Sequence, residues 1–154
     1  MSKIEIGKKA PSFTLDGTGG PWSLEDGKGA AVVIYFYPRD NTSGCTREGL
    51  DFAARCAQFK KAKAVVLGIS PDSVASHAKF KQKMAFPFEL LSDPDRKVCN
   101  LYAVFKEKSL YGRKYMGVER STFLIDAKGV LRHEWRKVKV KDHAEAVLAA
   151  VKAL

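Results

Sequence analysis

The sequence predicts a mixed α/β fold in which helices cover both faces of a central sheet. Residues 31–37 and 64–69 are nearly continuously apolar and β-branched, which is typical of strands covered on both faces. Helical patterns follow each of them, and this alternation indicates parallel strands joined by right-handed crossovers. A short glycine-containing loop at residues 126–129 separates two further strand patterns, which should form an antiparallel hairpin. We therefore expect a mixed sheet.

The elements can be placed in order along the chain. An N-terminal β-hairpin should join residues 12–15 to residues 22–24 through a glycine-rich turn. The other strands are expected at residues 31–37, 64–69, 122–125 and 130–135, and the helices at residues 45–61, 73–84, 94–102 and 143–154. Ser92 or Asp93 can cap the third helix, and Asp142 can cap the last one.

Length and cysteine content indicate the class of protein. A chain of 154 residues without a linker, repeat or low-complexity tract predicts one domain, residues 1–154. Its three cysteines, Cys45, Cys56 and Cys99, form no C-x-x-C pair, which argues against a disulfide framework, a zinc ribbon and thioredoxin-type disulfide exchange. With no apolar run of membrane-spanning length and no signal peptide, we expect a cytoplasmic protein that does not enter membranes.

The net charge of +10 raises the question of nucleic-acid binding. Most of the excess lies in residues 78–154, which hold 17 Lys and Arg against nine Asp and Glu. Lys137, Lys139 and Lys141 alternate in the basic tract 132–141, as on one face of an exposed strand whose lysines discourage aggregation. We therefore expect a solvated edge and no nucleic-acid partner. A non-enzymatic binding module that uses this basic half is the alternative.

The segment with the clearest chemistry runs from Pro38 to Cys45. A hydrophobic strand leads into a polar loop, and the loop opens a helix at Cys45. Ligands bind beyond the carboxyl ends of strands in α/β sheets, and a cysteine in the first helical turn meets free N–H groups and the positive end of the helix dipole. Cys45 is thus a candidate nucleophile, against the alternative of a small buried apolar residue. The Thr42 hydroxyl suits substrate binding or helix capping equally well.

The pattern P-x-x-x-T-x-x-C from Pro38 to Cys45 resembles the active-site signature of the peroxiredoxins, thiol peroxidases with a thioredoxin-like fold. The segment DNT-x-GCT at residues 40–46 and the short chain are similar to the subfamily called bacterioferritin comigratory protein or peroxiredoxin Q. Other matching segments occur in the expected order: G-x-x-A-P-x-F-x-L at residues 7–15, GISPD at 68–72, LSDP at 91–94 and GVERSTFLID at 117–126. The resemblance thus covers nearly the whole chain.

The resemblance implies a role for four residues. Cys45 would be the peroxidatic cysteine, which attacks hydrogen peroxide or an organic hydroperoxide and becomes a sulfenic acid. Thr42 would hydrogen-bond the peroxide, Arg120 would stabilise the thiolate and the peroxide oxygens, and Pro38 would shield the pocket. It also implies a monomer that needs no cofactor. His77, His133 and His143 are far apart in the sequence, so we expect surface histidines and no metal site.

The sequence departs from the subfamily at the resolving cysteine. Leu50 occupies one usual position, residues 80–82 hold no cysteine at the other, and Ser43 replaces a common proline. Cys56 lies 11 residues beyond Cys45. On one continuous helix that separation is about 16 Å, whereas a disulfide spans at most about 7 Å between Cα atoms.

The two remaining cysteines therefore have structural interpretations. We expect Cys56 and Cys99 to pack in or near the core. This favours a one-cysteine cycle completed by an external thiol from thioredoxin, glutaredoxin or glutathione. A two-cysteine cycle with Cys99 as resolving residue, or as second choice Cys56, stays open.

Overall fold

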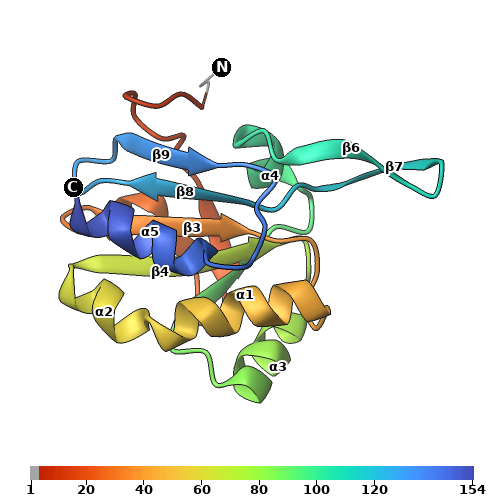
Figure 1. Cartoon of the computed structure of the whole chain (residues 1–154), viewed down its shortest axis with the longest axis horizontal. Helices are drawn as coiled ribbons and strands as arrows, with labels where there is room; N and C mark the ends of the chain where they lie inside the picture. Colours follow the sequence, from red (N-terminus) through yellow and green to blue (C-terminus); the bar gives the residue numbers. More distant parts are fainter. Residues whose placement is uncertain (1–3) are drawn as a thin grey trace.

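The structure, a computed structural model, describes residues 4–154. A seven-stranded mixed sheet with the order β2-β1-β5-β4-β3-β8-β9 forms its centre (Figure 1). The strands are β1 (Thr14–Gly17), β2 (Trp22–Ser23), β3 (Ala31–Phe36), β4 (Ala64–Ser70), β5 (Glu89–Ser92), β8 (Ser121–Ile125) and β9 (Leu131–Trp135). Strand β4 pairs in parallel with β3 and β5, and the other pairs are antiparallel. The predicted mixed sheet and N-terminal hairpin are confirmed.

Helices cover both faces of this sheet. They are α1 (Ser43–Ala54), α2 (Cys56–Lys61), α3 (Val74–Met84), α4 (Lys97–Leu101) and α5 (His143–Lys152), with a short 3₁₀ turn at Leu24–Gly27. Alternate residues of β3 point to opposite faces. Val33 and Tyr35 join the core beneath α1, α2, α3 and α5, while Val32 and Ile34 join the core beneath α4 and the N-terminal segment. Both faces of β3 are thus buried, as its continuous apolar sequence predicted.

The single helix predicted at residues 45–61 is wrong, because the chain breaks at Arg55 into α1 and α2. The Arg55 guanidinium hydrogen-bonds the Asp51 carbonyl oxygen at 3.0 Å, and that oxygen is the acceptor a continuing helix would offer to the backbone of Arg55. The Arg55 N–H instead donates to the Phe52 carbonyl, which tightens the turn. Cys56 therefore begins a new helix.

One of the two helices with a predicted cap starts later than expected, and the other starts where predicted. Helix α4 begins at Lys97, later than expected, yet the Asp93 carboxylate still accepts from the backbone N–H groups of Val98 and Cys99. Asp93 thus supplies the capping carboxylate, although Arg96 occupies the N-cap position itself. Helix α5 begins at His143 with Asp142 at its N-cap position, as predicted, but Asp142 has φ 62° and its side chain makes no capping hydrogen bond to the described residues.

A second hairpin was not predicted. Strands β6 (Phe105–Leu110) and β7 (Arg113–Val118) form a separate two-stranded sheet that projects from the body of the molecule (Figure 1). Most of its residues are exposed, so no alternation of apolar and polar residues marks the strands in the sequence.

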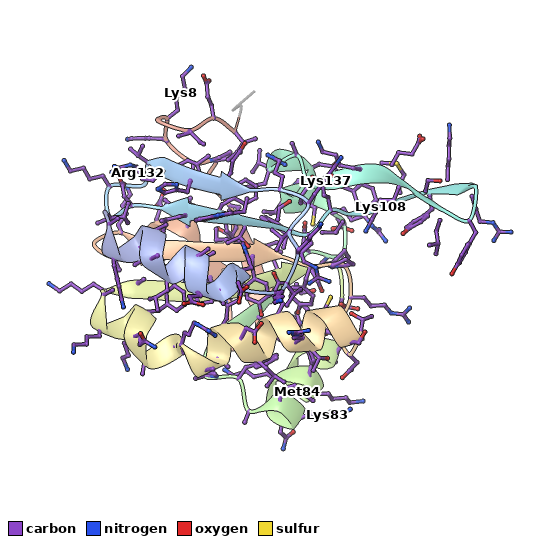
Figure 2. The ribbon with its side chains drawn as sticks, in the orientation of Figure 1. Lys8, Lys83, Met84, Lys108, Arg132 and Lys137 are labelled. Carbon is purple, nitrogen blue, oxygen red and sulfur yellow. The ribbon has the colours of Figure 1, made fainter. Side chains whose placement is uncertain are left out.

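The basic tract is not a strand beyond Trp135. Residues 136–142 form the loop between β9 and α5, held in part by the Val138 N–H, which donates to the Arg120 carbonyl. Lys137, labelled in Figure 2, is exposed together with Lys139 and Lys141. The predicted exposure is correct, and the predicted strand edge is wrong. Within residues 4–154, no helix is both long enough and apolar enough to span a bilayer.

Candidate active site

The candidate nucleophile lies where β3 ends and α1 begins. Strand β3 ends at Phe36, a loop follows, and Thr42 is the last residue before the helix. Cys45 falls in the first turn of α1 and is only 2% exposed. The predicted placement beyond the carboxyl end of a central strand is confirmed, although the sulfur-bearing residue is more buried than an open loop suggests.

Arg120 contacts the Cys45 sulfur. It directly precedes β8, which is the antiparallel neighbour of β3, so sheet pairing brings it across to the start of α1. Its Nη2 donates to Sγ at 3.3 Å. A Cβ atom added to Gly44 would lie 3.1 Å from the same nitrogen, so glycine permits this approach. A guanidinium and the first turn of a helix thus face one sulfur, which stabilises negative charge there.

Glu48 completes this arrangement, and sequence reasoning missed it. Nη1 of Arg120 donates to Glu48 Oε1 at 2.6 Å, so the two nitrogens of one guanidinium hold a carboxylate and a sulfur. Glu48 is 1% exposed, and its Oε2 has no hydrogen-bond partner among residues 4–154. Burial raises the pKa of this carboxyl from 4.5 to about 7, against the lowering effect of Arg120. The available signal was its spacing, three residues after Cys45 on the same face of a helix.

Glu48 predicts a specific pH dependence of stability. The pKa of Glu48 is raised in the folded protein. Its contribution to the free energy of unfolding is therefore fully present below pH 4.5 and is lost as the pH rises to about 7. Glu48→Gln cannot titrate. Between about pH 5 and pH 8, the free energy of unfolding of the wild type should therefore fall relative to that of the variant, by at most about 3 kcal/mol.

Urea unfolding at several pH values measures this difference. The matched control is Glu145→Gln, which changes an exposed carboxyl on α5 and should follow the wild type across the same range. If the free energy of unfolding changed with pH in the same way for the wild type and Glu48→Gln, Glu48 would be ionised at neutral pH in the folded protein.

Thr42 occupies the cap position of α1 but does not use its side chain as a cap. Its exposed hydroxyl donates to the Arg39 carbonyl oxygen at 3.0 Å. The lone pairs of this hydroxyl can still accept a hydrogen bond from a bound molecule. The substrate-binding interpretation of Thr42 therefore fits its position better than the capping interpretation.

Pro38 and Thr42 line a groove together with residues of the β6–β7 hairpin, whereas Cys45 and Arg120 are not among its lining residues. The hairpin contributes apolar side chains, including Phe105, Leu110 and Met116. Lys108, labelled in Figure 2, comes from the same hairpin. Of the four predicted site residues, the structure thus brings Cys45 into contact with Arg120 and places Pro38 and Thr42 at a shared groove.

The prediction of three surface histidines holds only for His133, which is exposed. His143 is buried, and its Nε2 lies 2.8 Å from the Thr122 hydroxyl. Burial, with the charge of Arg120, lowers the pKa of His143 to about 4, so its ring is neutral at neutral pH. His77 is completely buried and its Nδ1 lies 2.8 Å from Asp40. The burial of His77 and His143 results from tertiary packing, which the residues next to a histidine in the sequence do not reveal.

The other two cysteines lie apart from the site. Cys99 is fully buried in the core on the α4 face of the sheet, whereas Cys45 belongs to the core on the opposite face. Burial, followed by the charge of Asp93, raises the pKa of the Cys99 thiol, which makes it a poor nucleophile. Cys56 is half-buried at the start of α2, and burial raises its pKa as well. Both positions agree with the predicted packing roles.

Comparison with known proteins identifies the family. The AhpC/TSA family matches residues 6–134. The chain is 52% identical over 146 residues to a putative peroxiredoxin bcp of Coxiella burnetii, covering 94% of this chain and 97% of that protein. It is 50% identical over 150 residues to peroxiredoxin Bcp of Bacillus subtilis, with 97% and 96% covered.

The solved structures lead to the same assignment. Peroxiredoxin Q of Xanthomonas campestris superposes with a TM-score of 0.87 at 51% identity, over 92% of this chain and 90% of that one. The mixed sheet with helices on both faces is therefore the thioredoxin-like fold of the peroxiredoxins. With its cysteine at the start of α1, this chain belongs to the AhpC/TSA family as a Bcp-type peroxiredoxin, a thiol-dependent peroxidase.

Proposed function

We propose that this chain reduces hydrogen peroxide and organic hydroperoxides through a sulfenic acid at Cys45, in a one-cysteine cycle that an external thiol completes. The observation that carries the proposal is the 3.3 Å contact between Arg120 Nη2 and the Cys45 sulfur at the first turn of α1. A thiolate is the reactive form of cysteine, and this contact sets a cation beside it.

The reaction begins when the Cys45 thiolate attacks one peroxide oxygen. An S–O bond forms, the O–O bond breaks, and the leaving oxygen departs as water or an alcohol after it takes up a proton. The Arg120 guanidinium stabilises the charge that develops on the oxygens, and the Thr42 hydroxyl accepts a hydrogen bond from the peroxide. Pro38, which lines a groove together with Thr42, has the role of shielding the reacting atoms from water in this proposal.

The groove supports reduction of organic hydroperoxides as well as hydrogen peroxide. Its hairpin wall offers apolar surface to an alkyl group, next to the loop that carries Thr42. Among the similar solved structures are complexes that address the alkyl peroxide reduction activity of Xanthomonas campestris bacterioferritin comigratory protein, 47% identical to this chain with a TM-score of 0.90. We extend that chemistry to this chain.

The second half of the cycle requires a thiol from outside. Leu50 occupies one position where a resolving cysteine is common, and Cys99 lies across the sheet from Cys45. An external thiolate attacks the sulfenic sulfur and releases water, leaving a mixed disulfide. A second external thiol then restores Cys45 and leaves with the first as a disulfide. Thioredoxin, glutaredoxin and glutathione all supply this chemistry, and we propose that such a donor serves a monomeric, cytoplasmic protein acting as one domain over residues 1–154.

The test is a map of thiol states after one equivalent of peroxide in the absence of added thiol. We expect a sulfenic acid on Cys45, trapped by dimedone, while Cys56 and Cys99 stay reduced. Non-reducing peptide mass spectrometry measures all three. An intramolecular disulfide from Cys45 to Cys99 or Cys56 would overturn the one-cysteine cycle, and oxidation confined to another cysteine would overturn the assignment of Cys45.

A further inference from the structure

A buried pair of ionisable side chains lies under the loop that leads to Cys45. Asp40, in that loop, is 6% exposed, and His77 of α3 is 0% exposed. The His77 Nδ1 atom lies 2.8 Å from Asp40 Oδ2. Neither residue contacts the Cys45 sulfur in the described contacts, and neither is needed for the chemical steps given above.

The hydrogen-bond partners determine the protonation of His77. Its Nε2 lies 2.9 Å from the Leu91 carbonyl oxygen, which can only accept, so this nitrogen carries a proton. The Asp40 carboxylate accepts hydrogen bonds from the hydroxyl groups of Tyr37 and Ser76, each at 2.7 Å. Such a carboxylate is ionised, so the His77 Nδ1 also donates to it. In this arrangement both ring nitrogens of His77 act as donors, as they do in an imidazolium ion.

Other charged groups agree with this assignment. Burial alone would raise the pKa of Asp40, but the hydrogen bonds from His77, Tyr37 and Ser76 lower it below its usual value. Asp72, in the turn after β4, adds a second carboxylate nearby, and one of its oxygens lies within 4.8 Å of an Asp40 carboxylate oxygen and of a His77 ring nitrogen. Burial raises the pKa of Tyr37, which keeps its hydroxyl protonated. One cation thus stands among two carboxylates.

The same cluster fixes the backbone at the entrance to the active-site loop. The Asp40 N–H donates to Asp72 Oδ2 at 2.8 Å, so Asp40 is held through its main chain as well as its carboxylate. The next residue, Asn41, has φ 63°, a left-handed conformation that asparagine adopts more readily than most residues. Thr42 and the first turn of α1 follow directly. A shift of Asp40 would therefore be passed to Thr42 and Cys45.

We propose that His77 is a positioning residue for the reaction at Cys45: its buried positive charge fixes Asp40 and thereby holds Thr42 and the start of α1 in the reactive arrangement. This inference rests on the proposed function of Cys45. It also assigns a role to α3, which otherwise covers the sheet. The side chains of Ser76 and His77 on this helix hydrogen-bond Asp40 in the loop.

Three variants test the proposal. In His77→Gln the amide reaches the position of Nε2 and can still bond Leu91, but it loses the bond to Asp40. In His77→Asn the amide reaches the position of Nδ1 and can still donate to Asp40. The matched control is Phe80→Leu, one turn along α3, which removes buried apolar volume without a polar change in the cluster.

The main measurement is kcat/KM for hydrogen peroxide with a saturating thiol donor, beside the thermal melting temperature. Because small displacements of reacting groups are costly, we expect a loss of about tenfold or more in His77→Gln and a clearly smaller loss in His77→Asn. Phe80→Leu should lower the melting temperature and leave kcat/KM within about twofold. Equal losses in both His77 variants, or a similar loss in Phe80→Leu, would reduce His77 to a packing residue and overturn the proposal.

A spectroscopic measurement on the resting wild-type protein supplies a second readout. Nitrogen-15 NMR should show protons on both His77 ring nitrogens at neutral pH, and Asp40→Asn should remove one of them. A neutral His77 ring in the wild type would overturn the inference even if the variants lose activity. Failure of the proposed function looks different, because peroxide would then be consumed without oxidation of Cys45 in every one of these proteins.

Discussion

Cys45→Ser is expected to abolish thiol-dependent peroxide consumption, with a fall in kcat/KM of at least about 10⁴-fold. A serine hydroxyl stays protonated at neutral pH and cannot form a sulfenic acid. Oxygen is smaller than sulfur, so the exchange fits the 2% exposed site and leaves the contacts between Arg120 and Glu48 available. The loss should therefore be chemical, with circular dichroism and urea unfolding close to the wild type.

The controls for this variant are the other two cysteines. Cys56→Ser should keep the wild-type rate, since Cys56 is half-buried at the start of α2, beyond the end of α1 that lies opposite the first turn. Cys99→Ala should be less stable because it leaves a small cavity in the α4-side core, but its kcat/KM should be unchanged. Measurable turnover in Cys45→Ser, or loss of turnover in Cys99→Ala at a temperature where it is folded, would contradict the assignment.

Features that depend on residues close together in the sequence could be predicted for this chain. The continuous apolar runs of β3 and β4 identify strands buried on two faces, and their parallel pairing follows from the helices between them. Cys45 could be found for the same reason, since a strand, a loop and a helix start are all local patterns. Arg120 was chosen by resemblance, and the pairing of β8 with β3 explains why it reaches the sulfur.

Features that depend on contacts between distant residues could not be predicted. Glu48 and His77 have the sequence surroundings of exposed helical residues, but packing against Arg120 and Asp40 buries them. The break at Arg55 depends on a side chain that takes a backbone acceptor within an otherwise helical pattern. Most residues of the β6–β7 hairpin are exposed, so the alternation of apolar and polar residues that identifies most strands is absent.

Arg120→Met is expected to lower kcat/KM for hydrogen peroxide by about 10²–10³-fold, the usual cost of removing one donor to a developing negative charge. Methionine has a similar length and fills the space without a charge. Arg120→Lys keeps the charge but cannot hold Glu48 and the Cys45 sulfur with two separate nitrogens, so its loss should be intermediate. Stopped-flow measurement of Cys45 oxidation gives the rate of this step directly.

A second variant separates the catalytic effect of Arg120 from its structural effect. Removing Arg120 leaves the buried Glu48 carboxyl without its cation, so Arg120→Met should also lose stability as the pH rises. The double variant with Glu48→Gln removes that unpaired acid and should recover much of the stability at alkaline pH. It should not recover the rate, because the donor to the sulfur and the peroxide is still missing. Recovery of the rate together with stability would mean that Arg120 acts on the reaction only by neutralising Glu48.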